Sequence, residues 1–162
     1  MAVTITRRLF LAQTAAVCAL AHAGMADAGM TELEGFLPIF TGLDLRGWLP
    51  GSGAWRVEGG DIRGAGGSAP LWSEKTYAGF SLVADLKLLA VTPDTPQGIL
   101  LRDAQGNIIA PCLPSAPLDS GKWMRLCVSV KPGDTGFGIG PWQIGLSGAG
   151  GDVAWRNLFL RG

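Results

Sequence analysis

Histidine is almost absent from this sequence of 162 residues, which contains one histidine and one tyrosine. The histidine, His22, lies within the first thirty residues, which have the pattern of an export signal. Without it the mature chain has no histidine-based catalytic triad, no histidine-ligated zinc site and no imidazole general base. Any catalysis must then depend on carboxylates, lysine, Tyr77, a bound metal or backbone groups.

Net charge is lacking as well. The 13 Lys and Arg residues balance the 13 Asp and Glu residues, and loss of Arg7 and Arg8 with the signal makes the mature chain slightly acidic. A nucleic-acid-binding surface needs an excess of basic residues to neutralise phosphates. The composition therefore argues against nucleic acid as a partner.

Helical patterning is missing after the signal. No stretch keeps the apolar period of about 3.6 residues that marks an amphipathic helix for three turns, and no internal repeat is visible. Instead, 25 Gly and 10 Pro separate short apolar runs, which is typical of turns between strands. The sequence predicts one all-β domain, because 162 residues suffice for one core and not comfortably for two.

The N-terminus is interpreted as a twin-arginine export signal spanning residues 1–28. The motif TRRLFL, from Thr6 to Leu11, is followed by an apolar stretch that ends at Leu20 and by small-residue cleavage sites near Ala23 and Ala28. Residues 29–35 are then a polar lead-in, residues 36–162 form the domain, and the protein is expected in the periplasm. The apolar stretch is short for a bilayer span, so we expect no membrane contact after cleavage; a retained anchor is the alternative.

Strict alternation of apolar and polar residues predicts three long strands, at 79–89, 122–131 and 152–161. In the first, alternation places Asp85 and Lys87 on the face opposite the core. In the last, it places Val153, Trp155, Asn157 and Phe159 on one face. Shorter strands are predicted at 54–58, 69–73, 97–102 and 142–146.

These strands predict a two-sheet antiparallel sandwich of six to eight strands. The segment 107–119 carries three prolines and is expected to be a loop. Two cysteines remain after the signal, Cys112 and Cys127. Because an exported protein meets an oxidising compartment, they are either a disulfide pair or two buried thiols.

Four stretches, in order, resemble the exported 3-keto-disaccharide hydrolase-like domains: IFTGLDLRGW, WRVEGGDIRG with LWSEKTYAGFSLVADLKL, QGILLRD, and IGLSGAGGDVAWRNLFLRG. Together they cover most of residues 39–161. The resemblance implies a concanavalin-A-like jelly-roll sandwich. The chain departs from the family between Arg102 and Trp123, where the usual Gly-Tyr-Glu segment is missing. It therefore resembles a shortened and divergent member of the family.

The resemblance implies a hydrolase or lyase that cleaves 3-keto glycosides. In such a substrate the ketone acidifies a neighbouring C–H, so a general base and a cation near the enolate oxygen suffice. We expect Asp85 to be the base and Arg102, on what looks like an adjacent strand, to hold the oxygen. Trp72, Glu74, Asp103 and Trp123 are candidate substrate-binding residues, no cofactor is evident, and a divalent cation is an open alternative.

The same residues allow other interpretations. Each charged candidate is also an ordinary surface charge, and Trp72 and Trp123 are either sugar-stacking platforms or packing residues. Trp48, Trp55 and Trp155 are expected in the core, and the stretch IFTGLDLRGWLP is expected to be an entry strand and turn near the closing strand. The alternative function is a non-catalytic carbohydrate-binding module or accessory subunit on the same fold. A third hypothesis is a structural partner in an exported complex.

Overall fold

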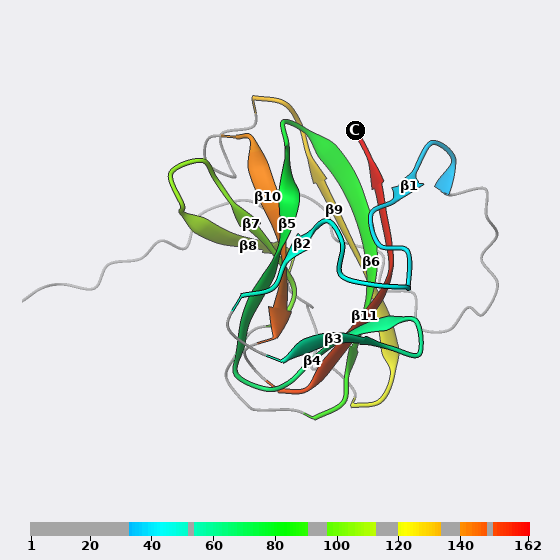
Figure 1. The fold of residues 1–162 in the computed structure, drawn as a ribbon. Helices are drawn as coiled ribbons and strands as arrows, with labels where there is room; N and C mark the ends of the chain where they lie inside the picture. The colour runs from blue at the N-terminus through cyan, green and yellow to red at the C-terminus, as the bar shows by residue number, and fades with distance from the viewer. Residues whose placement is uncertain (1–32, 52–53, 91–96, 113–119, 134–139, 149–150) are drawn as a thin grey trace, which may run out of the picture.

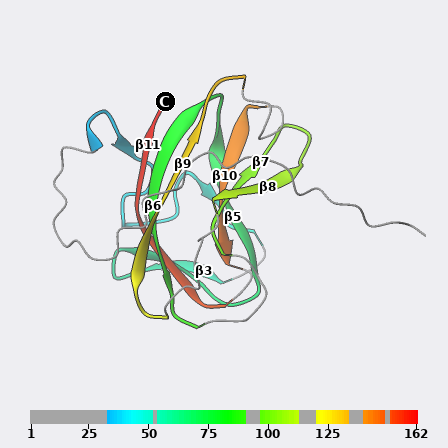
Figure 2. The same ribbon diagram turned by 180° about the vertical axis from the view of Figure 1, so that it is seen from behind.

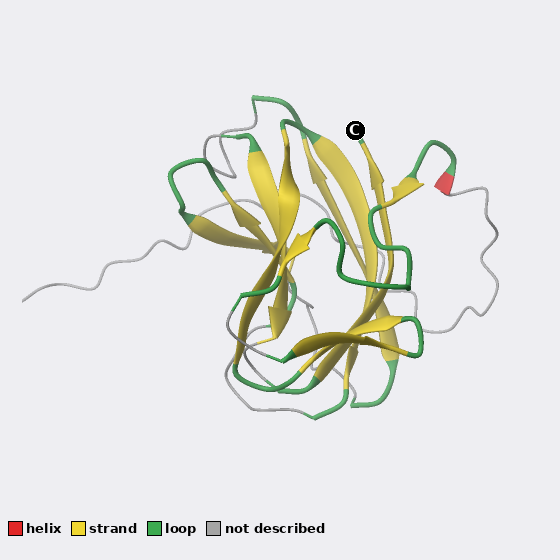
Figure 3. Cartoon of the chain, viewed as in Figure 1, coloured by secondary structure: helices red, strands yellow, loops and turns green. Residues whose placement is uncertain are grey.

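The fold is a sandwich of two antiparallel sheets, seen in a computed structural model (Figures 1 and 2). The structure describes residues 33–51, 54–90, 97–112, 120–133, 140–148 and 151–162, so the predicted export signal lies outside the described residues and stays a prediction. Apart from one short helical turn at the start, the described chain consists of strands and loops (Figure 3). The predicted all-β sandwich is confirmed, and its strand arrangement is consistent with a jelly roll.

One sheet has six strands, in the order β3-β4-β11-β6-β9, with β1 also paired to β11. Its strands are β1 (Leu37–Pro38), β3 (Trp55–Glu58), β4 (Asp61–Gly64), β6 (Phe80–Leu88), β9 (Trp123–Val130) and β11 (Val153–Arg161). The other sheet has five strands, in the order β2-β5-β10-β7-β8. Its strands are β2 (Trp48–Leu49), β5 (Ser68–Tyr77), β7 (Ile99–Arg102), β8 (Ile108–Cys112) and β10 (Trp142–Gly148).

The core lies between the two sheets and is filled by alternate residues of the long strands. On β6 the core residues are Phe80, Leu82, Ala84, Leu86 and Leu88, as the alternation predicts. Trp48, Trp55 and Trp155 are buried in the same cluster, which confirms their expected place. The intervening residues of each strand form the outer face of each sheet, and the two outer faces lie on opposite sides of the molecule.

The entry stretch from Ile39 to Pro50 lies beside the closing strand, as expected. Strand β1 pairs with β11, the Ile39 N–H donates to the Leu158 carbonyl at 2.9 Å, and the Trp48 indole donates to the Ile39 carbonyl at 3.1 Å. Arg46 and Asp44 are exposed and 3.6 Å apart. The stretch therefore anchors the N-terminal end of the domain.

Three sequence predictions about the strands are wrong. The described residues form eleven strands, where six to eight were expected. Residues 108–112, expected as part of a loop, form β8 despite Pro111, which is tolerated because β8 is an edge strand of the five-stranded sheet. The alternation predicted for 152–161 breaks at a bulge between Arg156 and Phe159, where Asn157 has a φ of 53°. Leu158 and Leu160 thus join the core cluster, and Phe159 does not.

Candidate functional site

Asp85 is a buried carboxylate on the outer face of the six-stranded sheet. Its Oδ1 accepts a hydrogen bond from Arg125 Nε at 2.9 Å, and its Oδ2 accepts from Arg125 Nη2 at 3.3 Å and from the Asn157 amide at 2.7 Å. Arg125 comes from the neighbouring strand β9 and Asn157 from β11 on the other side. These bonds join three adjacent strands, so the carboxylate already has a structural role.

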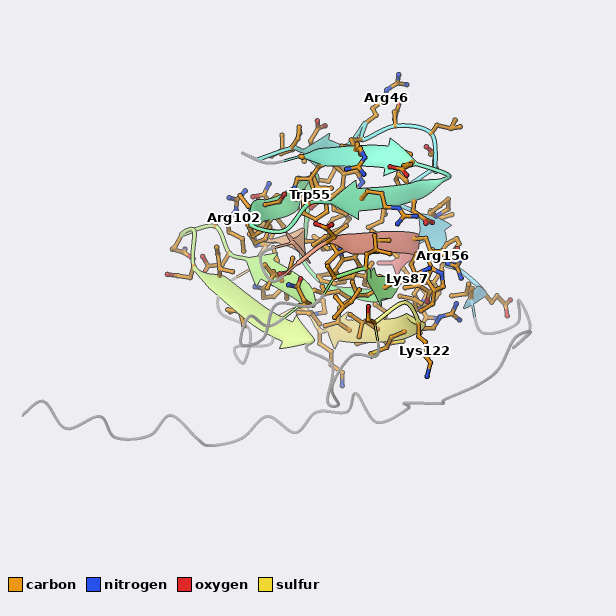
Figure 4. The ribbon with its side chains drawn as sticks, turned by 90° about the horizontal axis from the view of Figure 1, so that it is seen from below. Arg46, Trp55, Lys87, Arg102, Lys122 and Arg156 are labelled. Atoms are coloured by element: carbon orange, nitrogen blue, oxygen red, sulfur yellow. The ribbon has the colours of Figure 1, made fainter. Side chains whose placement is uncertain are left out.

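Arg102 lies in the other sheet, at the end of β7. The expectation that its strand is adjacent to that of Asp85 is wrong, because β7 pairs with β10 and β8 in the five-stranded sheet. Both side chains project away from the core, so they lie on opposite faces of the sandwich. In Figure 4, Arg102 is at one side of the sandwich and Lys87, which is two residues from Asp85 on the same strand, is at the other. One sugar unit cannot contact both residues across a packed core.

The guanidinium of Arg102 is held in place by Gln143 and Trp72. Gln143 Oε1 accepts from Arg102 Nε at 3.0 Å and from Nη2 at 2.6 Å, and the Gln143 amide donates in turn to the Ser73 carbonyl at 2.8 Å. The guanidinium carbon lies 4.4 Å from the ring centroid of Trp72. A planar cation fixed in this way loses little entropy when it donates its remaining N–H groups to a ligand.

Trp72 packs against the outer face of the sheet and is only 7% exposed. Its cross-strand partner is Gly145, and a Cβ added to Gly145 would come within 2.5 Å of the Trp72 ring. Only a residue without a side chain allows this close approach. Trp72 therefore supports Arg102 and does not offer an open ring for stacking.

Around Arg102 the outer face combines polar and apolar side chains. Cross-strand partners share a face, and Arg102 pairs with Ile108 and Gln143, while Gln143 pairs with Thr76. Ile108 is 57% exposed and Leu49, the partner of Trp72, is 43% exposed. We call this surface the Arg102 face; its members are Leu49, Trp72, Thr76, Leu100, Arg102, Ile108 and Gln143.

Asp103 and Glu74 border this surface with different roles. The Asp103 carboxylate closes the turn between β7 and β8 by accepting from the Gln105 and Asn107 backbone N–H groups and from the Asn107 amide. The Asn107 side-chain bond, aided by the backbone bonds, holds the pKa of Asp103 below its ordinary value. Glu74 is exposed, in an irregular part of β5 where its N–H bonds the Gly47 carbonyl.

The remaining candidates lie on the six-stranded sheet or outside the described residues. Trp123 shares the outer face of β9 with Arg125, as predicted, and lies on the sheet opposite the Arg102 face. Cys127 is exposed on the same face of β9, but the side chain of Cys112 is not among those described. The disulfide between them therefore stays a prediction.

The described residues offer no obvious place for a metal ion. Among them, no group of three or more His, Cys, Asp or Glu side chains is arranged to bind one. In the same part of the chain, no helix is long and apolar enough to cross a membrane.

Sequence comparisons identify no family. No protein-family model matches the chain, and no curated protein matches it. Among solved structures, the fold is similar to that of a protein from Parabacteroides distasonis ATCC 8503 whose own assignment as a glycosyl hydrolase is provisional. The TM-score is 0.56 at 17% identity, over 80% of this chain and 94% of that one.

A second solved structure is similar over a smaller share of its length. It contains the CBM22-1–GH10 modules of the Clostridium thermocellum N-terminal endo-1,4-β-D-xylanase 10B, complexed with xylohexaose. The TM-score is 0.47 at 11% identity, over 73% of this chain and 26% of that one. At 17% identity the likeness to the Parabacteroides protein shows the fold alone, since one sandwich serves many functions.

Proposed function

We propose that this protein is an exported, periplasmic carbohydrate-binding protein that holds a sugar on the Arg102 face without cleaving it. The observation that carries the proposal is the fixed guanidinium of Arg102, bound by Gln143 and stacked on Trp72. Its remaining N–H groups suit sugar hydroxyl oxygens, and exposed Ile108, its partner on the neighbouring strand β8, suits the apolar C–H face of a pyranose. The sandwich likeness to a provisionally assigned glycosyl hydrolase supports sugar as the ligand class.

Binding without cleavage is favoured over the hydrolase hypothesis by the position of Asp85. A general base must lie within hydrogen-bond reach of the proton that it removes. Asp85 is on the opposite face from Arg102, and its oxygens accept from Arg125 and Asn157. Asp103, the acid next to Arg102, is likewise occupied within its own turn.

Calorimetric titration with a panel of neutral oligosaccharides tests the proposal. Arg102→Lys keeps the charge but loses the planar two-bond contact with Gln143, so affinity should fall at least about tenfold. Arg56→Lys is the matched control, because Arg56 is exposed and pairs with Glu58 at 2.9 Å on the other sheet. Equal affinities for both variants, or no binding to any sugar by the unmodified protein, would refute sugar binding at the Arg102 face.

The 3-keto glycoside hydrolase or lyase is the second candidate, favoured by the sequence resemblance and by the assignment of the Parabacteroides protein. Release of the aglycone from a 3-keto glucoside measures it directly. Turnover that depends on Arg102 but survives Asp85→Asn would support this activity with a different base. Absence of turnover together with sugar binding selects the non-catalytic function.

A further inference from the structure

A second cluster of polar side chains lies on the outer face of the six-stranded sheet, away from the Arg102 face. Arg156 extends from β11 across β6 and places its guanidinium carbon 3.9 Å from the ring centroid of Trp123 on β9. Lys87, on β6, places its Nζ 5.5 Å from the same centroid. Figure 4 shows Lys87 and Arg156 close together at one side of the sandwich. We call Lys87, Trp123 and Arg156 the Trp123 patch.

A bulge in β11 lies directly beside this patch. The register with β6 shifts between Arg156 and Phe159, and Asn157 has a φ of 53°, which a non-glycine residue adopts at a cost in free energy. In a regular strand Asn157 would point into the core. The bulge instead lets its amide bond Asp85 at 2.7 Å, next to Arg156. Bulges that re-aim side chains are common beside binding sites.

The charges in the patch are not paired one to one. Asp85 is bonded by Arg125 and Asn157, and Arg156 Nε is 4.0 Å from its Oδ2, which is too long for a hydrogen bond. Within the described part of the chain, this buried Nε has no hydrogen-bond partner, and no acid forms an ion pair with Lys87.

Other cations on the same sheet differ in their acids, although Arg63 likewise has a buried Nε without a hydrogen-bond partner among the described residues. Arg56 pairs with Glu58 at 2.9 Å and Arg63 pairs with Asp61 at 3.3 Å, so each has an acid of its own close by. The Trp123 patch thus holds two neighbouring cations. Arg156 shares the single acid Asp85 with Arg125, at 4.0 Å and 2.9 Å respectively, and no acid among the described residues pairs with Lys87. Such an arrangement favours an anion supplied from outside.

We infer that the Trp123 patch is a binding site for a carboxylate or sulfate group of an acidic glycan. Arg156 and Lys87 supply charged donors to the anion, and the half-buried Trp123 ring offers apolar surface beside them for sugar carbons. The site is on the sheet opposite the Arg102 face and therefore goes beyond the proposed binding of neutral sugar. It holds whether or not the Arg102 face binds its ligand.

Binding of three probes to the purified protein tests the inference: polygalacturonate, which carries carboxylates, dextran sulfate, which carries sulfates, and neutral dextran. We expect binding of at least one acidic glycan, and none of dextran at this site. Lys87→Ala and Arg156→Gln should each weaken acidic-glycan binding about tenfold, since each removes one charge-assisted contact. Arg56→Ala, which removes the same charge from the same sheet, should change it less than about twofold.

Several outcomes would overturn the inference. These are failure of both acidic glycans to bind, equal weakening by Arg56→Ala, or poly-glutamate binding as tightly as the acidic glycans through the same two residues. Because Arg156 also contacts Trp123, urea unfolding must show that Arg156→Gln is folded. If it is not, Lys87→Ala decides alone, since Lys87 is partly exposed and makes no hydrogen bond that braces the sheet among the described residues.

Discussion

Replacing Asp85 with asparagine should destabilise the protein by about 2 kcal/mol. The carboxylate accepts three hydrogen bonds, at 2.9, 3.3 and 2.7 Å, and a hydrogen bond to a charged group contributes about 1.5–3 kcal/mol when buried. The side chain of Arg125 is 46% exposed, so water screens its share. An asparagine keeps one acceptor for Arg125 but turns an amide N–H₂ toward the donor of Asn157, and it loses the charge.

Urea unfolding at neutral pH, followed by tryptophan fluorescence, measures this loss. Asp44→Asn is the matched control, because it makes the same chemical change at an exposed acid that lies 3.6 Å from Arg46. The control should change the free energy of unfolding by less than about 0.5 kcal/mol. Equal stability of the Asp85 and Asp44 variants would refute the bracing role of Asp85 and restore it as a candidate base.

Three further predictions concern other parts of the fold. Gly145→Ala should cost about 1–3 kcal/mol in urea unfolding, because its Cβ would lie 2.5 Å from the Trp72 ring; unchanged stability would contradict the close packing. Asn107 holds the pKa of Asp103 below its ordinary value. Asp103 therefore contributes its full stabilisation above about pH 4, and this contribution is lost as the pH falls through the lowered pKa of the folded state. Asp103→Asn should remove that part of the acid dependence, and an unaltered pH profile would count against it. Burial raises the pKa of Tyr77, and the chain has one tyrosine, so tyrosinate absorbance reports this residue alone. The pKa measured in this way should lie above about 10 in the folded protein and return to about 10 in urea.

Local patterns in the sequence predicted the strands well where each strand is regular. The alternation from Phe80 to Leu88 placed every core residue of β6 correctly and put Asp85 and Lys87 outside, because period two depends only on the strand itself. The same rule failed in β11 at Asn157, since nothing in one sequence marks where a strand admits an extra residue. It also missed β8, where Pro111 argued for a loop and the edge position made a strand acceptable.

The candidate site was less predictable, because it depends on which strands pair. Asp85 and Arg102 end up in different sheets, and strand order is set by contacts between distant parts of the chain. Gln143, which fixes Arg102, was missed for the same reason: it lies 41 residues away in sequence. The one local signal was its place beside Trp142 in a short predicted strand, where alternation puts a polar residue on the outer face.

Asp85 and Arg102 lie on opposite faces of the sandwich, so we expect sugar binding to depend on Arg102 and not on Asp85. One binding measurement tests this separation. The affinity of a neutral oligosaccharide bound by the unmodified protein is compared with that of Arg102→Gln and Asp85→Asn, at a temperature where both variants are folded. We predict that Arg102→Gln loses at least about tenfold in affinity and that Asp85→Asn binds as the unmodified protein does. Loss of binding in Asp85→Asn with Arg102→Gln unaffected would contradict the account.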